Sequence, residues 1–166
     1  AFHDALTGLP NRVLLHERLG HAIERAKREH VGIAVMFMDL DRFKAVNDEL
    51  GHGAGDLLLQ LVSQRVKNLL RASDTLARLG GDEFVVLLEN ASDVDASTRL
   101  AGKIVAAISE PIDLNGHTVQ IGASIGISIF PTDGADPENL LKRADLAMYA
   151  AKSEGRNTFR VYGAGL

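Results

Sequence analysis

The sequence contains no cysteine, so it can form neither a disulfide framework nor a metal site with thiolate ligands. It contains no apolar run of the roughly 18 residues that a membrane-spanning helix requires. It also contains no internal repeat and no low-complexity stretch. The formal net charge of −4 argues against a surface that coats nucleic acid, so we expect no nucleic-acid partner.

What the sequence does contain is typical of a soluble globular protein, with 46% hydrophobic and 24% charged residues. A chain of 166 residues is long enough to bury one substantial core. It begins at Ala1 without methionine and enters a motif within a few residues. We therefore expect residues 1–166 to be a single domain of a longer multidomain protein, with residues 1–10 as an irregular lead-in.

The first half of the chain is predicted to contain helices around one buried strand. Asn11 is suited to cap the first helix, and the apolar run over residues 31–38 is typical of a central strand covered on both faces. Residues 41–48 are predicted to form a short helix, followed by a glycine-rich loop over residues 51–56. The expected core positions of the two longer helices are Leu15, Leu19, Ala22, Ile23 and Ala26, and then Leu58, Leu61, Val62, Val66 and Leu69.

The second half is predicted to contain two hairpins. Residues 74–79 and 84–88 flank a glycine turn, and Asn115-Gly116 is a strong hairpin signal. The alternation over residues 119–129 predicts a long strand with one face on the core, and residues 158–161 can add an edge strand. Two helices are expected, one from Ser92 or Asp93 and one capped by Asp136. Their core positions are Leu100, Ala101, Ile104, Val105 and Ile108, and then Leu140, Leu141, Ala144, Ala147 and Ala151.

Two tight hairpins among alternating helices and strands predict an α/β fold whose central sheet is mainly antiparallel and flanked by helices. The same hairpins argue against a doubly wound parallel sheet. They also argue against a phosphoacceptor receiver domain, in which Asp39 would be the acceptor on a parallel sheet.

Three carboxylates are expected to meet at one edge of this sheet. Asp39 follows the buried strand, and Asp82 and Glu83 lie on the tip of the first hairpin. Together with the carbonyl of Leu40 they offer an all-oxygen site suited to Mg²⁺ or Mn²⁺, whereas no neighbouring His or Cys favours zinc. The alternative is a solvated acidic hairpin tip with no ligand.

Basic groups near these carboxylates are candidates for holding phosphates. Lys44 and the backbone amides of residues 42–44 lie at the start of the short helix, and Lys152 and Arg156 lie at the end of the last helix. Each of them taken alone has the alternative explanation of an ordinary solvated surface charge.

The motifs resemble those of GGDEF domains, the catalytic modules of diguanylate cyclases. The signature Gly80-Gly81-Asp82-Glu83-Phe84 is intact, and further motif residues occur at family spacing from residue 4 to residue 157. These further motifs are Asp4 to Arg12, Asp39-Leu40-Asp41-Arg42-Phe43-Lys44, Asn47-Asp48, Gly51-His52, Gly55-Asp56 and Lys152 to Asn157. The resemblance implies a fold related to the class III nucleotide cyclases and polymerase palms, in a cytoplasmic domain.

The resemblance implies that the domain condenses two GTP molecules into cyclic di-GMP and two pyrophosphates, as a homodimer of half-sites with two Mg²⁺ per active site. Asp39, Asp82 and Glu83 are then catalytic, and with the Leu40 carbonyl they are the metal ligands. Asn47 and Asp56 resemble the guanine-binding residues. The other substrate-binding positions are Arg42, Phe43, Lys44, Gly80, Gly81, Lys152 and Arg156.

A separate Arg-x-x-Asp pair, Arg71 and Asp74, stands just ahead of the hairpin. By resemblance it is an inhibitory site for the product cyclic di-GMP, and the alternative is a local surface ion pair. The opening residues 2–12 resemble GGDEF domains that precede an EAL phosphodiesterase domain. The rival function is therefore a non-catalytic regulatory domain that binds GTP or cyclic di-GMP beside sensory and EAL domains.

Overall fold

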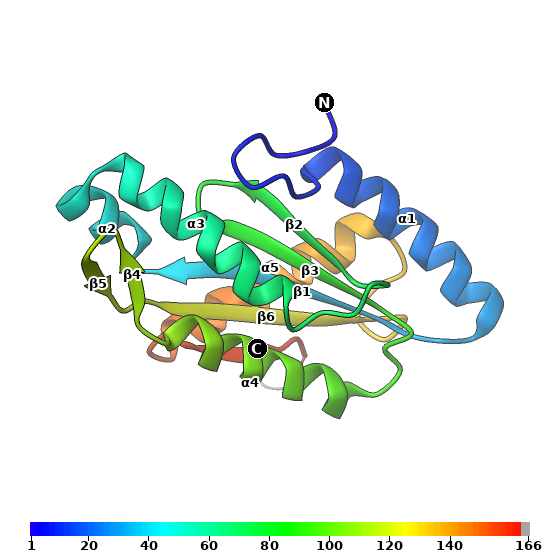
Figure 1. The fold of residues 1–166 in the computed structure, drawn as a ribbon. Helices are drawn as coiled ribbons and strands as arrows, with labels where there is room; N and C mark the ends of the chain where they lie inside the picture. Colours follow the sequence, from blue (N-terminus) through cyan, green and yellow to red (C-terminus); the bar gives the residue numbers. More distant parts are fainter. Residues whose placement is uncertain (164–166) are drawn as a thin grey trace.

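The structure is a computed structural model, and it describes residues 1–163 (Figure 1). Its helices are α1 (Arg12–Glu29), α2 (Phe43–Leu50), α3 (His52–Lys67), α4 (Val94–Ser109) and α5 (Pro137–Ser153). Its strands are β1 (Ile33–Asp41), β2 (Thr75–Gly80), β3 (Glu83–Glu89), β4 (Ile112–Leu114), β5 (His117–Val119), β6 (Gly122–Phe130) and β7 (Thr158–Val161). Among the helices of residues 1–163, none combines the length and hydrophobicity needed to cross a bilayer.

The central sheet has the strand order β2-β3-β1-β6-β7, and β4 pairs with β5 in a separate hairpin. Every neighbouring pair in the central sheet is antiparallel except β6 and β7, which run parallel. The predicted mainly antiparallel α/β fold is therefore confirmed. The register of β1 matters for function, since it sets Asp39 opposite Glu83 on β3 and opposite Ser124 on β6.

Helices cover both faces of the sheet. The even-numbered residues of β1 from Ala34 to Leu40 pack in a core with α3 and α4. The odd-numbered residues from Ile33 to Phe37 pack in a second core with α1 and α5. Asp39 continues the odd-numbered series, so its side chain projects on the α1 and α5 face. The packing of β1 between the two cores thus places the Asp39 carboxylate near the end of a fully buried strand.

The strand β6 corrects one prediction, because all nine of its residues are buried and not only one face. Its alternating small residues lie under helix α5. A Cβ on Gly126 would lie 2.0 Å from the Ala144 carbonyl oxygen, so the helix backbone occupies the space that a side chain would need. Small residues on the second face reflect close helix packing here, whereas the alternation predicted a strand with only one face on the core.

The segment after β1 corrects two further boundaries. Strand β1 extends to Asp41, and Arg42 then adopts a left-handed conformation with φ of 72°, so α2 begins at Phe43 and not at residue 41. The expected glycine-rich loop over residues 51–56 is wrong, because α3 already begins at His52. Only Gly51, with φ of 92°, interrupts the two helices.

The remaining elements agree with the pattern. Asn11, Asp93 and Asp136 accept backbone hydrogen bonds as caps of α1, α4 and α5. Both expected hairpins are present. The lead-in is more ordered than expected, since residue His3 bridges to Pro10. Of the expected core positions, the half-buried ones are Leu61, Leu69, Leu100, Val105 and Leu141.

Candidate active site

Asp39 is a buried carboxylate whose two oxygens have different surroundings. Its Oδ2 forms an ion pair with the ammonium of Lys152, which α5 brings across the sheet edge. Its Oδ1 is buried and accepts no hydrogen bond. An unpartnered buried carboxylate oxygen is costly, because it has lost water without gaining a donor. This oxygen is therefore suited to a cation or to a donor on a bound ligand.

The turn between β2 and β3 places Asp82 beside Asp39. Gly80 and Gly81 both have positive φ, at 147° and 49°, which permits the tight reversal. The Leu40 amide donates to the Asp82 carbonyl over 3.3 Å, so the turn is joined to the end of β1. Burial raises the pKa of Asp82 to about 7, and the adjacent Asp39 carboxylate adds to this effect through its negative charge, while Lys152 opposes it.

Glu83 and Lys152 share the same electrostatic environment. Burial raises the pKa of Glu83, and the charges of Asp39 and Asp145 add to this, while Arg12 and Lys152 oppose it. Burial alone would lower the pKa of Lys152, yet its contact with Asp39 and the nearby acids raise it. The net effect is a cluster in which carboxylates outnumber the cations that neutralise them.

This donor set fits a hard divalent cation only in part. Within residues 1–163, no three His, Cys, Asp or Glu side chains are grouped as a complete metal site. Mg²⁺ is nevertheless commonly held by one or two carboxylates together with substrate phosphates and water. The free Oδ1 of Asp39 and the adjacent Asp82 supply such carboxylates.

The two expected guanine-binding residues lie on successive helices. Asn47 is half-buried on α2, and Asp56 is exposed in the first turns of α3. A Cβ on Gly55 would lie 1.8 Å from the Asn47 Oδ1, so this glycine makes room for the Asn47 side chain against α3. The Asn47 side chain therefore lies against the residue that precedes Asp56 in the chain.

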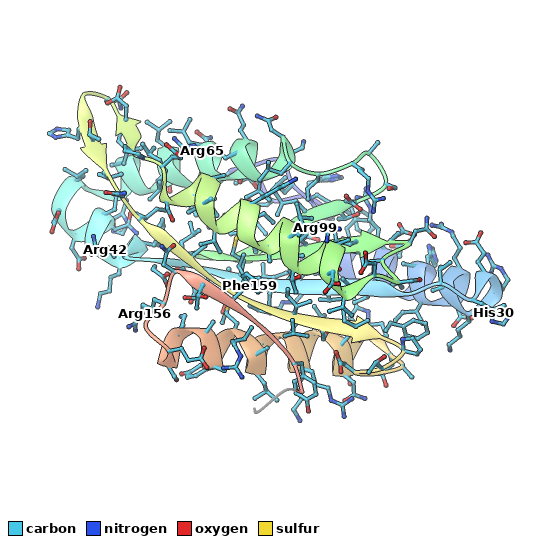
Figure 2. The ribbon with its side chains drawn as sticks, turned by 90° about the horizontal axis from the view of Figure 1, so that it is seen from below. His30, Arg42, Arg65, Arg99, Arg156 and Phe159 are labelled. Carbon is cyan, nitrogen blue, oxygen red and sulfur yellow. The ribbon has the colours of Figure 1, made fainter. Side chains whose placement is uncertain are left out.

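The expected phosphate-binding residues Arg42 and Arg156 lie at the same end of the molecule as α2, which carries Asn47 (Figure 2). Arg42 and Arg156 line one cavity of about 370 Å³, together with Asp41 and Asn157 (Figure 2). Asp41 is buried, and each of its carboxylate oxygens already accepts a hydrogen bond. The Ser124 hydroxyl donates to Oδ1 and the Asn157 backbone amide donates to Oδ2, at 2.8 Å each. Phe43 and Lys44 form the first turn of α2, where Phe43 is half-buried and Lys44 is exposed.

Arg71 and Asp74 lie elsewhere, at the foot of β2 and separated from the turn by the length of that strand. The Asp74 side chain is only 2% exposed and accepts from the Arg71 amide at 2.9 Å. The Arg71 side chain is 63% exposed and also donates to the Glu89 carbonyl at 3.1 Å. Asp74 therefore has a structural task in its loop, whereas Arg71 offers a free face to a ligand.

Three residues that bear on this site, Asp145, Arg78 and Asp4, were given no role from the sequence, although Asp4 belongs to one of its motifs. Asp145 lies two helical turns before Lys152, and this spacing could have indicated it. Arg78 and Asp4 form an ion pair of 2.8 Å that connects the lead-in to the hairpin. No local pattern signals that pair, since 74 positions separate the two residues.

The chain matches the protein family described as "Diguanylate cyclase, GGDEF domain" over residues 1–158. It is 54% identical over 159 residues to the bifunctional diguanylate cyclase/cyclic di-GMP phosphodiesterase MucR of Pseudomonas aeruginosa, covering 96% of this chain but only 23% of MucR. The GGDEF domain of TpbB from the same species superimposes with a TM-score of 0.94 at 44% identity, covering 97% of this chain and 94% of that chain. The GGDEF domain of DgcB from Caulobacter crescentus, solved with c-di-GMP, gives a TM-score of 0.88 at 26% identity, covering 97% and 95%.

Proposed function

Because this chain belongs to the GGDEF domain family of diguanylate cyclases, we propose that it condenses two GTP molecules into cyclic di-GMP and two pyrophosphates. The observation that carries the proposal is the convergence of Asp39, Asp82 and Lys152, with one oxygen of Asp39 left unpartnered. If the protein itself neutralised and hydrogen-bonded all of these charges, the binding of a cation or a triphosphate would gain little free energy.

In the proposed reaction, Asp39, Asp82, Glu83 and the Leu40 carbonyl would hold two divalent cations, which would supply charge neutralisation for the triphosphate and would acidify the attacking 3′-hydroxyl. Asp82 accepts the proton of that hydroxyl. Its place on the turn beside Asp39 supports this role, because a general base must lie within hydrogen-bond reach of the proton that it accepts.

The basic residues bind the triphosphate. Lys152, which pairs with Asp39 in the structure, would hold a phosphate, and Arg156 and Lys44 would add further positive charge. The backbone amides at Arg42 and Phe43 contribute donors at the start of α2. Charges placed in advance around the leaving pyrophosphate stabilise the transition state without reorganisation at the moment of reaction.

Asn47 and Asp56 recognise the guanine. A carboxylate accepts from the guanine N1–H and N2–H₂, and an amide can donate to O6 or N7. Adenine lacks these partners, so its binding would leave polar groups unpaired. Gly80 and Gly81 have open space where side chains would stand, which lets the nucleotide approach the hairpin backbone.

One domain binds one GTP, so ring closure requires two domains that face each other. Each 3′-oxygen attacks the α-phosphorus of the opposite nucleotide, a new P–O bond forms, and the bond to pyrophosphate breaks in line. The product cyclic di-GMP then binds at Arg71 and Asp74 and holds domains in an unproductive arrangement. The exposed face of Arg71 supports this second site.

The alternative function is a regulatory one. It is supported by the relative MucR, which is named both a cyclase and a phosphodiesterase and of whose length this chain spans only 23%. In that alternative the domain binds GTP or cyclic di-GMP and regulates a neighbouring EAL domain without catalysis. The carboxylates and lysine described above would then serve binding alone.

The deciding experiment incubates the purified domain with GTP and Mg²⁺ over a range of domain concentrations and separates the nucleotides by chromatography. We expect cyclic di-GMP with GTP and no cyclic product with ATP. GTP binding without turnover, even after fusion to a dimerising partner, would support the regulatory alternative and contradict the cyclase proposal.

A further inference from the structure

Arg78 on β2 joins the N-terminal lead-in to the catalytic turn. Its Nη1 donates to Asp4 at 2.8 Å, and its Nε donates to the Gly81 carbonyl at 3.0 Å. Its backbone amide donates to the Pro10 carbonyl at 3.0 Å. The Arg78 and Asp4 side chains are only 13% and 18% exposed, so this pair is well shielded from solvent.

Asp4 is itself held rigidly in the lead-in. Its Oδ2 accepts from the amide and the hydroxyl of Thr7, at 2.9 and 2.7 Å, while its Oδ1 accepts from Arg78. The backbone closes the same turn through bonds from Asp4 to Leu9 and from Gly8 to Asp4. Burial would raise the pKa of Asp4, but these hydrogen bonds and the Arg78 charge lower it. The carboxylate is thus a fixed, charged anchor for the guanidinium.

Both peptide groups next to Asp82 are held by partners outside the turn. Arg78 binds the Gly81 carbonyl on one side, and the Leu40 amide binds the Asp82 carbonyl on the other. The turn needs such anchors, because glycines at 80 and 81 restrict the backbone less than any other residue. Arg78 can hold a carboxylate and a carbonyl together because its guanidinium presents several donors in one plane.

We propose that Arg78 is a positioning residue that fixes the Gly81–Asp82 peptide and so aims the Asp82 carboxylate, and that Asp4 acts through Arg78. The proposal rests on the proposed function for the role of Asp82. It assigns a task to the Asp4 and Thr7 motif of the lead-in, which neither metal nor nucleotide binding requires.

The kinetic test compares Arg78→Ala, Arg78→Lys and Asp4→Asn with a control, Arg65→Ala. Arg65 on α3 (Figure 2) also joins elements, donating to the carbonyls of Ala107, Glu110 and Pro111 at 2.8 to 3.0 Å, but these partners lie in α4 and the segment after it and not in the turn between β2 and β3. We expect Arg78→Ala to lower kcat on the order of 10- to 100-fold, since small misplacements of catalytic groups have effects of this size. The KM for GTP should change less than about twofold, because Asn47 and Asp56 are untouched.

The conservative and double variants separate positioning from simple stability. Lysine can reach Asp4 or the carbonyl but not both, so Arg78→Lys should recover only part of kcat. Asp4→Asn should lower kcat less than Arg78→Ala, and combining the two should be no worse than Arg78→Ala alone. Equal kcat in Arg78→Ala and Arg65→Ala at matched thermal stability would overturn the proposal.

Hydrogen exchange of the Leu40 amide gives a readout that needs no turnover, since this amide bonds to Asp82. We expect faster exchange in Arg78→Ala and Asp4→Asn than in Arg65→Ala. Unchanged Leu40 exchange in a folded Arg78→Ala or Asp4→Asn variant would overturn the proposal. An inactive wild type would instead contradict the proposed function, and the exchange result would still decide the role of Arg78.

Discussion

At the scale of single residues, the site is governed by carboxylates that the protein does not neutralise. Asp39 has one ion pair and one unpartnered oxygen, and it raises the pKa of Asp82. Such an arrangement is unfavourable for the isolated domain and favourable for binding a cation. Local instability of this kind is typical of functional sites and supports the proposed metal binding.

Replacing either acid by its amide should abolish turnover. We expect Asp39→Asn and Asp82→Asn each to lower kcat by at least about 10³-fold, because cation-based stabilisation of the transition state amounts to several kcal/mol. Circular dichroism should show a folded domain in both cases. Asp95→Asn, which removes an exposed charge at the start of α4, serves as the control. Substantial activity in either folded active-site variant would refute the metal assignment.

Asp82→Asn should also stabilise the metal-free domain in a pH-dependent way. The pKa of Asp82 is raised from its ordinary value of 3.8 to about 7 on folding, so the folded state binds more protons between these values. The wild type therefore loses stability as the pH rises from about 4 to about 7. We expect urea denaturation with chelator to show a larger advantage of Asp82→Asn at pH 8 than at pH 5. A pH-independent difference would mean that Asp82 titrates normally.

Asp56→Ala tests the recognition of guanine. Loss of a charge-assisted bond should weaken GTP binding by about 2–3 kcal/mol, measured by calorimetry with a non-hydrolysable analogue. The weak affinity for the matching ATP analogue should stay unchanged, since Asp56 finds no partner on adenine. Equal affinity of the wild type for both analogues would show that Asn47 and Asp56 do not read the base.

Much of this site could be predicted from local sequence. A carboxylate at the end of a buried strand and two on a glycine turn indicate an acidic cluster. The bond between Lys152 and Asp39 could not be predicted, because it joins residues 113 positions apart through the packing of α5 on the sheet. The Asp4 and Arg78 pair is likewise visible only after the lead-in has folded against β2.

At the scale of elements, Gly126 of β6 controls how closely α5 approaches the sheet. Gly126→Ala would bring a Cβ within 2.0 Å of the Ala144 oxygen and 2.1 Å of the Met148 nitrogen. We expect a loss of about 1–3 kcal/mol or more in the free energy of unfolding, measured with urea, because the backbone must shift. Gly20→Ala on α1 is the control, since its Cβ would meet nothing within 4 Å. Equal stability of the two variants would contradict this packing.

The same strand shows where sequence patterns stop being informative about elements. Periodicity located β6 and the hairpins, because alternation and turn residues act locally. It did not reveal that Ser124, Gly126 and Ser128 lie under a helix, since small residues occur on solvated and on tightly packed faces alike. Similarly, Gly53 and Gly55 suggested a loop, whereas the second of them makes space for Asn47 within a helix.

At the scale of the whole molecule, activity should depend on the encounter of two domains. We expect the rate per domain to rise with domain concentration and with fusion to a dimerising partner, since in the proposed mechanism each domain supplies half of the site. Sedimentation of the same samples would give the fraction of dimer. A constant rate per domain across dilution, in a domain shown to be monomeric, would contradict the half-site mechanism.

The second prediction for the assembly concerns inhibition by the proposed product. Arg71→Ala should abolish inhibition by cyclic di-GMP and change the initial rate less than about twofold, because Arg71 lies a strand length from Asp82. Asp74 is unsuitable for this test, since its buried carboxylate holds the loop. The measurement is the rate against added cyclic di-GMP at several GTP concentrations. Undiminished inhibition of Arg71→Ala would make the pair a structural ion pair only.

The backbone of helix α5 packs against Gly126 at Ala144, and this point inside the core is the fulcrum about which the helix would tilt. Lys152 lies eight residues beyond Ala144, which is about 12 Å along a helix that rises 1.5 Å per residue. A tilt of about 5° at the fulcrum would therefore displace the Lys152 end by about 1 Å. The contact between Lys152 and Asp39 thus depends on how α5 packs on the sheet, through residues with no chemical part in the reaction. Mutations beneath α5 should alter the catalytic rate before they measurably unfold the domain.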